Sequence, residues 1–123
     1  MSPIVIDLRT APDARDVVHR AVQALAEGNV VAFPTETVYG LAVSALDELA
    51  VEHLIQLKGR SVRQPLTLAV KSCDDALDYV PDVGPLARRL ARRCWPGPVT
   101  LVLSDTHPDS LARQLPSKVQ ALV

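Results

Sequence analysis

Long apolar runs, a surplus of one charge and paired cysteines are all missing from this 123-residue sequence. No apolar stretch approaches the roughly 18 residues of a membrane span, so no membrane interaction is predicted. The first ten residues lack the basic start and the apolar core of a signal peptide. Cys73 and Cys94 form no CxxC pattern, which predicts reduced, structural thiols and a cytoplasmic location.

Several binding templates are missing as well. The five glycines are scattered, and no segment fits GxxxxGK[ST], GxGxxG or HExxH, which removes the common nucleotide-binding and metal motifs. Only 3% of the residues are aromatic, too few for the stacking platforms of single-strand binders. The net charge of −1 argues against nucleic-acid binding driven by global charge, although a local basic patch is compatible with it.

The composition that remains is typical of a globular chain, with 48% apolar and 22% charged residues. For a chain of 13.3 kDa, area scaling predicts a folded surface of about 6,500 Å² against roughly 19,000 Å² when extended. About two-thirds of the surface would then be buried. We therefore predict a single domain over residues 1–123, with a core that needs no disulfide.

Alternating segment types predict an α/β fold. The apolar run at 30–33 is typical of a strand buried on both faces, and the spacing of apolar residues between Val17 and Leu25 predicts a helix with a buried stripe. Strands are predicted at 3–8, 30–33, 41–43, 66–70, 99–103 and 119–123. Helices are predicted between Asp13 and Gly28 and at 47–57, 74–79, 85–94 and 108–114.

Three segments carry polar side chains next to predicted strands or glycines. PTETVYG follows a strand, where ligands of open α/β sheets lie, and its hydroxyls suit a small polar substrate; a proline-led turn capped by threonines is the alternative. KGR at 58–60, with Arg63, suits phosphate or carboxylate, or simply ends a helix with favourable cations. WPGP at 95–98 is either a packed corner or a pocket wall.

A fourth segment, RRLARRCW, is the most basic of the chain. Its arginines follow the spacing i, i+1, i+4, i+5, which places them along one flank of a helix. Such a stripe suits an RNA backbone. A solvated helix face is the alternative. The stripe comprises Arg88, Arg89, Arg92 and Arg93.

Taken in order, PTETVYGLA (34–42), KGR followed by PL (58–60 and 65–66) and WPGPVTLVL (95–103) resemble the YrdC/Sua5 family of threonylcarbamoyl-AMP synthases. The resemblance implies a twisted, open, mixed sheet flanked by helices, with a basic concave face. The family's later RxP and SxN elements are not found. We therefore expect residues 1–123 to form the N-terminal two-thirds of the family domain, truncated at its C-terminus.

The resemblance also implies an activity. Family members are nucleotidyltransferases that convert L-threonine, bicarbonate and ATP into L-threonylcarbamoyladenylate and pyrophosphate, with Mg²⁺ assisting. Other proteins then transfer the threonylcarbamoyl group to adenosine 37 of tRNA, giving t6A. The alternative is a YrdC-like module that binds RNA on its basic concave surface without catalysis.

By position, the resemblance assigns residues to these roles. Threonine binding falls to the turn after the 30–33 strand, and phosphate binding and catalysis fall to the KGR segment. The residues implied to bind threonine are Thr35, Thr37 and Tyr39; those implied to be catalytic are Lys58 and Arg60; those implied to bind the nucleotide are Lys58, Arg60, Arg63 and Thr100.

Overall fold

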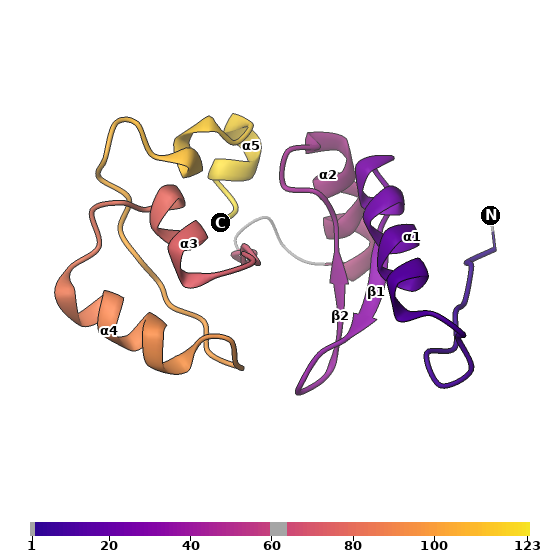
Figure 1. Ribbon diagram of the computed structural model, residues 1–123. Helices are drawn as coiled ribbons and strands as arrows, with labels where there is room; N and C mark the ends of the chain where they lie inside the picture. Colours follow the sequence, from indigo (N-terminus) through magenta and orange to yellow (C-terminus); the bar gives the residue numbers. More distant parts are fainter. Residues whose placement is uncertain (1, 60–63) are drawn as a thin grey trace.

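The computed structural model describes residues 2–59 and 64–123, and its elements form two groups (Figure 1). The first group holds two helices and a β-hairpin, and the second holds short helices joined by long extended segments. Helices and a small sheet occur together, so the predicted α/β class is confirmed. In the described ranges, no helix combines the length and the apolar character that crossing a membrane requires.

The first helix, α1 (Ala14–Ala26), begins and ends where its local chemistry predicts. The Asp13 carboxylate accepts a hydrogen bond from the backbone N–H of Arg15 at 2.9 Å and so caps the helix. Gly28, at φ 83°, turns the chain away two residues after the helix ends. The predicted helix is confirmed, but its predicted buried stripe is wrong, because no residue of α1 is buried.

The hairpin consists of β1 (Val31–Pro34) and β2 (Tyr39–Ala42), paired antiparallel. Val31 lies opposite Ala42, and Pro34 lies opposite Tyr39. The prediction that β1 is buried on both faces is wrong: three of its four residues are exposed. A two-stranded sheet has no central strand, so an apolar run in it stays open to solvent unless other elements cover it.

The second helix, α2 (Glu48–Lys58), also follows local signals. The Asp47 carboxylate accepts from the Ala50 N–H at 3.1 Å, and Gly59 ends the helix in the left-handed conformation at φ 60°. Unlike α1, this helix buries residues: Ala50, Val51 and Leu54.

The second group contains α3 (Cys73–Tyr79), α4 (Pro85–Cys94), the 3-10 helix η1 (Leu111–Gln114) and α5 (Ser117–Gln120). The helices predicted at 74–79 and 85–94 are confirmed by α3 and α4, and the helix predicted at 108–114 is present only as η1. The N-cap of α3 is Ser72, whose hydroxyl accepts a hydrogen bond from the Asp75 N–H at 3.1 Å.

Four of the predicted strands are not strands in the described part of the chain. A strand needs a second backbone hydrogen-bonded along its length, and this is missing for residues 3–8, 66–70 and 99–103. In the second of these segments, the Leu66 N–H donates to the Leu122 carbonyl, which does not extend into a ladder. The prediction for 119–123 is wrong because the segment turns: the Gln120 N–H donates to the Pro116 carbonyl at 2.9 Å, within α5.

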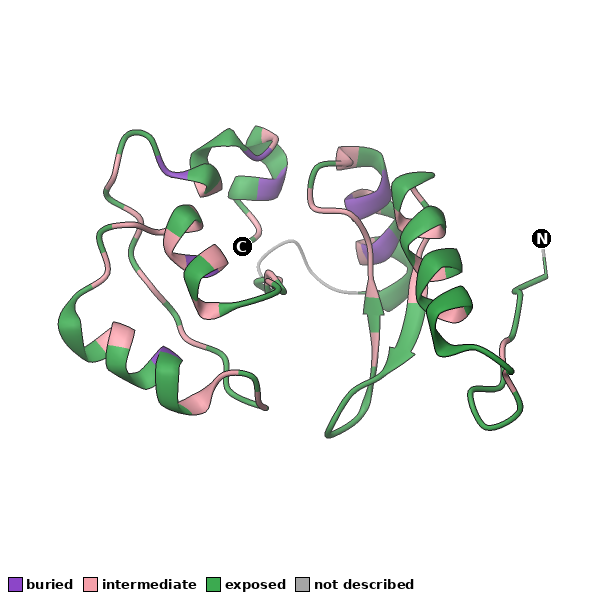
Figure 2. Ribbon diagram, viewed as in Figure 1, coloured by how far each residue is buried: buried purple, intermediate pink, exposed green. Residues whose placement is uncertain are grey.

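The hydrophobic core lies where the two groups meet. Val51 of α2 packs with Leu115 and Val119, which are 4% and 1% exposed. Across the same contact, the Lys118 ammonium lies 3.1 Å from Glu52 and 3.2 Å from Glu48. The whole chain exposes 9,410 Å², well above the predicted 6,500 Å², so this core is small (Figure 2).

Candidate functional site

The β1–β2 turn is organised by the hydroxyl of Thr35. Its Oγ1 accepts hydrogen bonds from the N–H groups of Thr37 and Val38, each at 3.2 Å, and donates to the Val38 carbonyl. A threonine side chain that bonds backbone groups two and three residues ahead fixes a turn. The structure therefore gives Thr35 the turn-capping role that the sequence left open as an alternative.

The other polar side chains of this turn lie on the surface. Glu36, Thr37 and Tyr39 are exposed, and Tyr39 retains 78% of its accessible area. The hydroxyls of Thr35 and Thr37 lie 3.3 Å apart. The turn thus presents two hydroxyls, a carboxylate and a phenol to solvent within five residues, in a backbone that is held by its own hydrogen bonds.

Lys58 is the last residue of α2, and its side chain is exposed. Gly59 follows in the left-handed conformation, so the chain leaves the helix directly after the cation. A lysine at a helix C-terminus lies next to the negative end of the helix dipole, which favours its charge. The predicted partners of Lys58 in a phosphate clamp, Arg60 and Arg63, lie outside the described residues.

The WPGP segment forms a tight corner after α4. The Trp95 indole N–H donates to the Val99 carbonyl at 2.7 Å. A side chain on Gly97 would meet the Cys94 carbonyl oxygen at 2.5 Å, so only glycine fits at this position. This corner fixes the backbone immediately before Thr100, whose side chain is exposed.

The sequence treated Trp95 as a wall of a corner or pocket and missed its role as a donor. The available signal was chemical: a partly covered indole N–H usually finds an acceptor. Which acceptor it finds depends on the turn geometry, and residue types alone did not predict that.

The three sequence motifs are not joined by direct contacts in the structure. No hydrogen bond or ion pair within residues 2–59 and 64–123 links the β1–β2 turn, Lys58 and Thr100. In Figure 1 the β1–β2 turn and the segment after α4 lie toward the same end of the molecule, on the two different groups of elements. A ligand that contacted both the β1–β2 turn and the segment after α4 would therefore have to span the two groups of elements.

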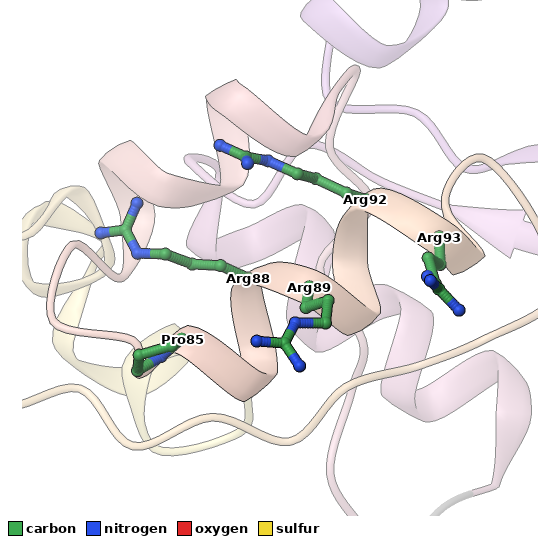
Figure 3. A pocket seen from close by; sticks show the side chains of 5 residues that line it. All are labelled: Pro85, Arg88, Arg89, Arg92 and Arg93. Carbon is green, nitrogen blue, oxygen red and sulfur yellow. The ribbon is translucent and has the colours of Figure 1, made fainter.

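Helix α4 carries four arginines, and in Figure 3 Arg88 and Arg92 extend to one side of the helix while Arg89 and Arg93 extend to another. Together with Pro85, Arg88, Arg89, Arg92 and Arg93 line a surface hollow of about 460 Å³ (Figure 3). Arg88 is tied down, because its guanidinium donates to the carbonyls of Pro81 at 3.1 Å and Val83 at 3.3 Å. The helical spacing predicted from the sequence is confirmed, since all four residues lie on α4.

A dedicated metal site is not formed by the described residues. No group of three or more His, Cys, Asp or Glu side chains in those ranges lies close enough to hold an ion. Glu36 is the one carboxylate of the β1–β2 turn, and it is exposed.

The fold and these motifs together define an α/β domain of the Sua5 type. The model of the Sua5/YciO/YrdC family, described as "Telomere recombination", matches residues 23–121. The chain therefore belongs to the Sua5/YciO/YrdC family.

Curated relatives in this family carry the name threonylcarbamoyl-AMP synthase. The protein from Pyrococcus abyssi is 46% identical over 81 residues, which are 66% of this chain and 24% of the relative. The Bacillus subtilis protein is 35% identical, over 84% of this chain and 30% of its own length. The Mus musculus protein is 41% identical, over 75% and 32%.

Solved structures show the same likeness in three dimensions. A double variant of Pyrococcus abyssi Sua5 superposes with a TM-score of 0.83 at 34% identity, covering 99% of this chain and 33% of that one. Pyrococcus abyssi Sua5 in complex with L-threonine gives 0.72 at 37% identity, covering 86% and 29%. The predicted YrdC-like fold is thus confirmed, and the chain spans about a quarter to a third of these relatives.

Proposed function

We propose that this chain contributes to a threonylcarbamoyl-AMP synthase, a nucleotidyltransferase that makes L-threonylcarbamoyladenylate and pyrophosphate from L-threonine, bicarbonate and ATP. One observation carries most of the weight: 86% of the chain superposes on a relative solved with L-threonine. The names of the curated relatives agree with it. Residues 1–123 would form the N-terminal part of the family domain.

The reaction requires positioning and charge stabilisation more than a reactive side chain. The threonine nitrogen attacks CO₂, formed from bicarbonate, and loses a proton to give a carbamate. A carbamate oxygen then attacks the α-phosphorus of ATP, and the bond to the pyrophosphate leaving group breaks. Two anions must approach each other, and charge grows on the pyrophosphate; cationic side chains stabilise both. No covalent nucleophile is needed.

The residues of the β1–β2 turn are proposed to hold threonine. Thr35 would act by fixing the turn, because its hydroxyl accepts two backbone N–H groups and donates to the Val38 carbonyl. Thr37 and Tyr39 are exposed and offer hydroxyl groups to a small polar ligand. This arrangement favours a ligand that is itself both donor and acceptor, as an amino acid is.

The cations are proposed to hold the nucleotide. Lys58, at the exposed end of α2, would contact the phosphates and stabilise the leaving group, together with Arg60 and Arg63. Thr100 would contact the nucleotide from the corner that Trp95 fixes. Magnesium would enter as the MgATP substrate.

The test is pyrophosphate release from MgATP by this chain, with threonine and bicarbonate omitted in turn. We expect release only when both are present. Release without threonine, or no release with all substrates, would overturn the proposed activity for this chain. The non-catalytic RNA-binding alternative predicts no threonine-dependent release.

A matched pair of lysine variants tests the clamp. Lys58→Ala is expected to lower kcat/KM for ATP by about 10²–10³, the usual effect of losing one preorganised charge-stabilising group. Lys71→Ala is the control, because Lys71 is also exposed and lies outside the three motifs. Equal losses in the two variants would remove Lys58 from the site.

The product chemistry implies later partners. An acyl-adenylate is an activated mixed anhydride, so a transferase must take up the threonylcarbamoyl group, with adenosine 37 of tRNA as the proposed acceptor. A cytoplasmic location, where tRNA and ATP are available, remains a prediction.

A further inference from the structure

Residues 3–6 extend from the molecule without a backbone partner. Ile4 and Val5 are 80% and 85% exposed. Within residues 2–59 and 64–123, no backbone hydrogen bond involves residues 3–6. The first turn follows at Asp7, whose carbonyl accepts two backbone N–H groups. Three consecutive β-branched residues favour a strand, so this segment has the composition of a strand but no ladder.

The β1–β2 hairpin has two outer edges, and they are not equivalent. In an antiparallel pair, residues that bond across the ladder alternate with residues whose backbone groups point outward. The Thr35 N–H donates to the Val38 carbonyl at 3.3 Å, which sets the phase of this alternation. By the register of the hairpin, Tyr39 and Leu41 of β2 then direct their backbone groups away from β1. On the opposite edge, Pro34 has no N–H to donate, so β2 offers the better edge for an added strand.

Within one chain, residues 3–6 and the outer edge of β2 do not meet. Figure 1 shows the N-terminal segment on the far side of α1 and β1 from β2. In the ranges that the structure describes, β2 is paired only with β1. The chain therefore carries both an unpaired strand-like segment and an unpaired edge. Exchange between two copies satisfies both, and a reciprocal exchange closes into a symmetric pair.

The spacing of the backbone groups fits such an exchange. Ile4 and Ile6 are two residues apart, so in an extended segment their backbone groups point to the same edge. Tyr39 and Leu41 have the same separation on β2. In an antiparallel arrangement Ile6 lies opposite Tyr39 and Ile4 lies opposite Leu41, and each pair exchanges two hydrogen bonds. The N–H of Val5 then points away from β2.

The surface that such an interface requires is present. The chain exposes 9,410 Å², against roughly 6,500 Å² expected for a folded chain of its mass. The difference is several times the roughly 800 Å² that each partner buries in a standard interface. Phe33 and Leu41 of the hairpin are each 37% exposed, so apolar area is available there as well as on residues 3–6.

We propose that this chain forms a symmetric dimer in which residues 3–6 of each copy add, antiparallel, to the outer edge of β2 of the other copy. This goes beyond the proposed synthase reaction and does not depend on it. The interface lies beside the turn proposed to hold threonine, because Tyr39 belongs to both.

Sedimentation velocity over a wide range of protein concentrations, without substrates, measures the association. We expect the parent chain to form a dimer. Ile6→Pro removes an N–H that donates to the partner at both edges of the dimer, and it should weaken association by about tenfold or more. Val5→Pro is the matched control: it also removes one N–H and one β-branched side chain, but on the side away from β2, so it should keep the parent affinity. Circular dichroism checks that both variants keep their helices.

A cysteine pair tests the register. In a background with Cys73→Ser and Cys94→Ser, one copy carries Ile6→Cys and the other carries Tyr39→Cys. Opposed, hydrogen-bonded residues have Cα atoms about 5.5 Å apart, within reach of a disulfide. Oxidation of the mixture should give a covalent heterodimer, and Val5→Cys mixed with Tyr39→Cys should give much less.

Three results would overturn the proposal. A chain that stays monomeric at every concentration would leave the edge of β2 to a different polypeptide. Equal weakening by the two proline variants would place the contact elsewhere on the chain. Equal cross-linking by the two cysteine pairs would contradict the register. None of these results bears on the synthase assay, so the two proposals fail separately.

Discussion

The helices α1 and α2 have similar local signals and opposite surroundings. Each starts at an aspartate whose carboxylate caps the first turn, and each is followed by a glycine with positive φ. Yet α1 contacts β1 and buries none of its residues, whereas α2 contacts α5 and buries three. The purple segments of Figure 2 lie on α2 and not on α1.

The difference shows that an apolar stripe predicts a helix but not the partner that covers it. Val18 and Val22 of α1 remain 61% and 57% exposed, although they belong to the pattern that predicted burial. Val51 of α2 is 3% exposed because Leu115 and Val119 lie against it. Burial therefore depends on a segment far away in the sequence, which a local pattern does not contain.

The largest expected effect comes from removing the partner of α2. Leu115→Ala should lower the free energy of unfolding by about 2–5 kcal/mol, because it opens a cavity between α2 and α5. Val22→Ala on α1 should change it by no more than about 0.5 kcal/mol. Urea denaturation followed by circular dichroism measures both. If the two variants lost similar amounts of unfolding free energy, α1 would be covered in solution, and the difference between α1 and α2 would not hold.

The helix caps should give an intermediate effect. Asp47→Ala removes the acceptor of the Ala50 N–H and should cost about 1 kcal/mol in global stability. Asp13→Ala removes the equivalent bond to Arg15, but α1 supports no core, so the loss should appear as local fraying. Hydrogen exchange separates the cases: only Asp47→Ala should accelerate exchange in α5.

The smallest expected effect is electrostatic. Hydrogen bonds and charge from Glu52, and then Glu48, raise the pKa of Lys118 above its ordinary value of 10.5. A raised pKa means that the stabilisation is complete below 10.5 and is lost as pH rises through the folded-state value. Because Lys118 is exposed, salt should weaken this contribution.

Comparing the parent chain with Lys118→Met tests whether the stabilisation by Lys118 decreases as the pH rises. The difference in urea midpoint should be constant near neutral pH and should shrink at alkaline pH. A difference that grows with pH would contradict the assignment. Glu27→Gln at the C-cap of α1 is the control, since within the described part of the chain the Glu27 side chain accepts a hydrogen bond from Gln23, four residues earlier.

The helices were predictable from sequence because their signals are local. Asp13, Gly28 and Asp47 act within a few residues of a helix end, and the structure places them there as predicted. Strands were less predictable, because a ladder needs a second backbone beside it. The apolar segment 99–103 reads as a strand, yet it has no ladder partner among the described residues.

In the candidate site, too, local features were predictable from the sequence and the tertiary arrangement was not. That the threonines shape the turn after β1 was an open alternative from residue types, and Thr35 does so. How that turn, Lys58 and Thr100 are arranged around a ligand is a tertiary property, and Arg60 and Arg63 lie outside the described residues. The resemblance to the family was visible in the sequence because three short motifs occur in the family's order. Recognising that order requires no knowledge of how the chain packs.

The core contact between Val51 and the Leu115–Val119 segment also has a kinetic consequence. About 65 residues separate the two sides, so a long loop must close before this core gains any burial. During synthesis α2 would leave the ribosome well before its partner exists, with Val51 and Leu54 exposed in the interval. Folding of this core should therefore be a late event, and the hairpin can form much earlier.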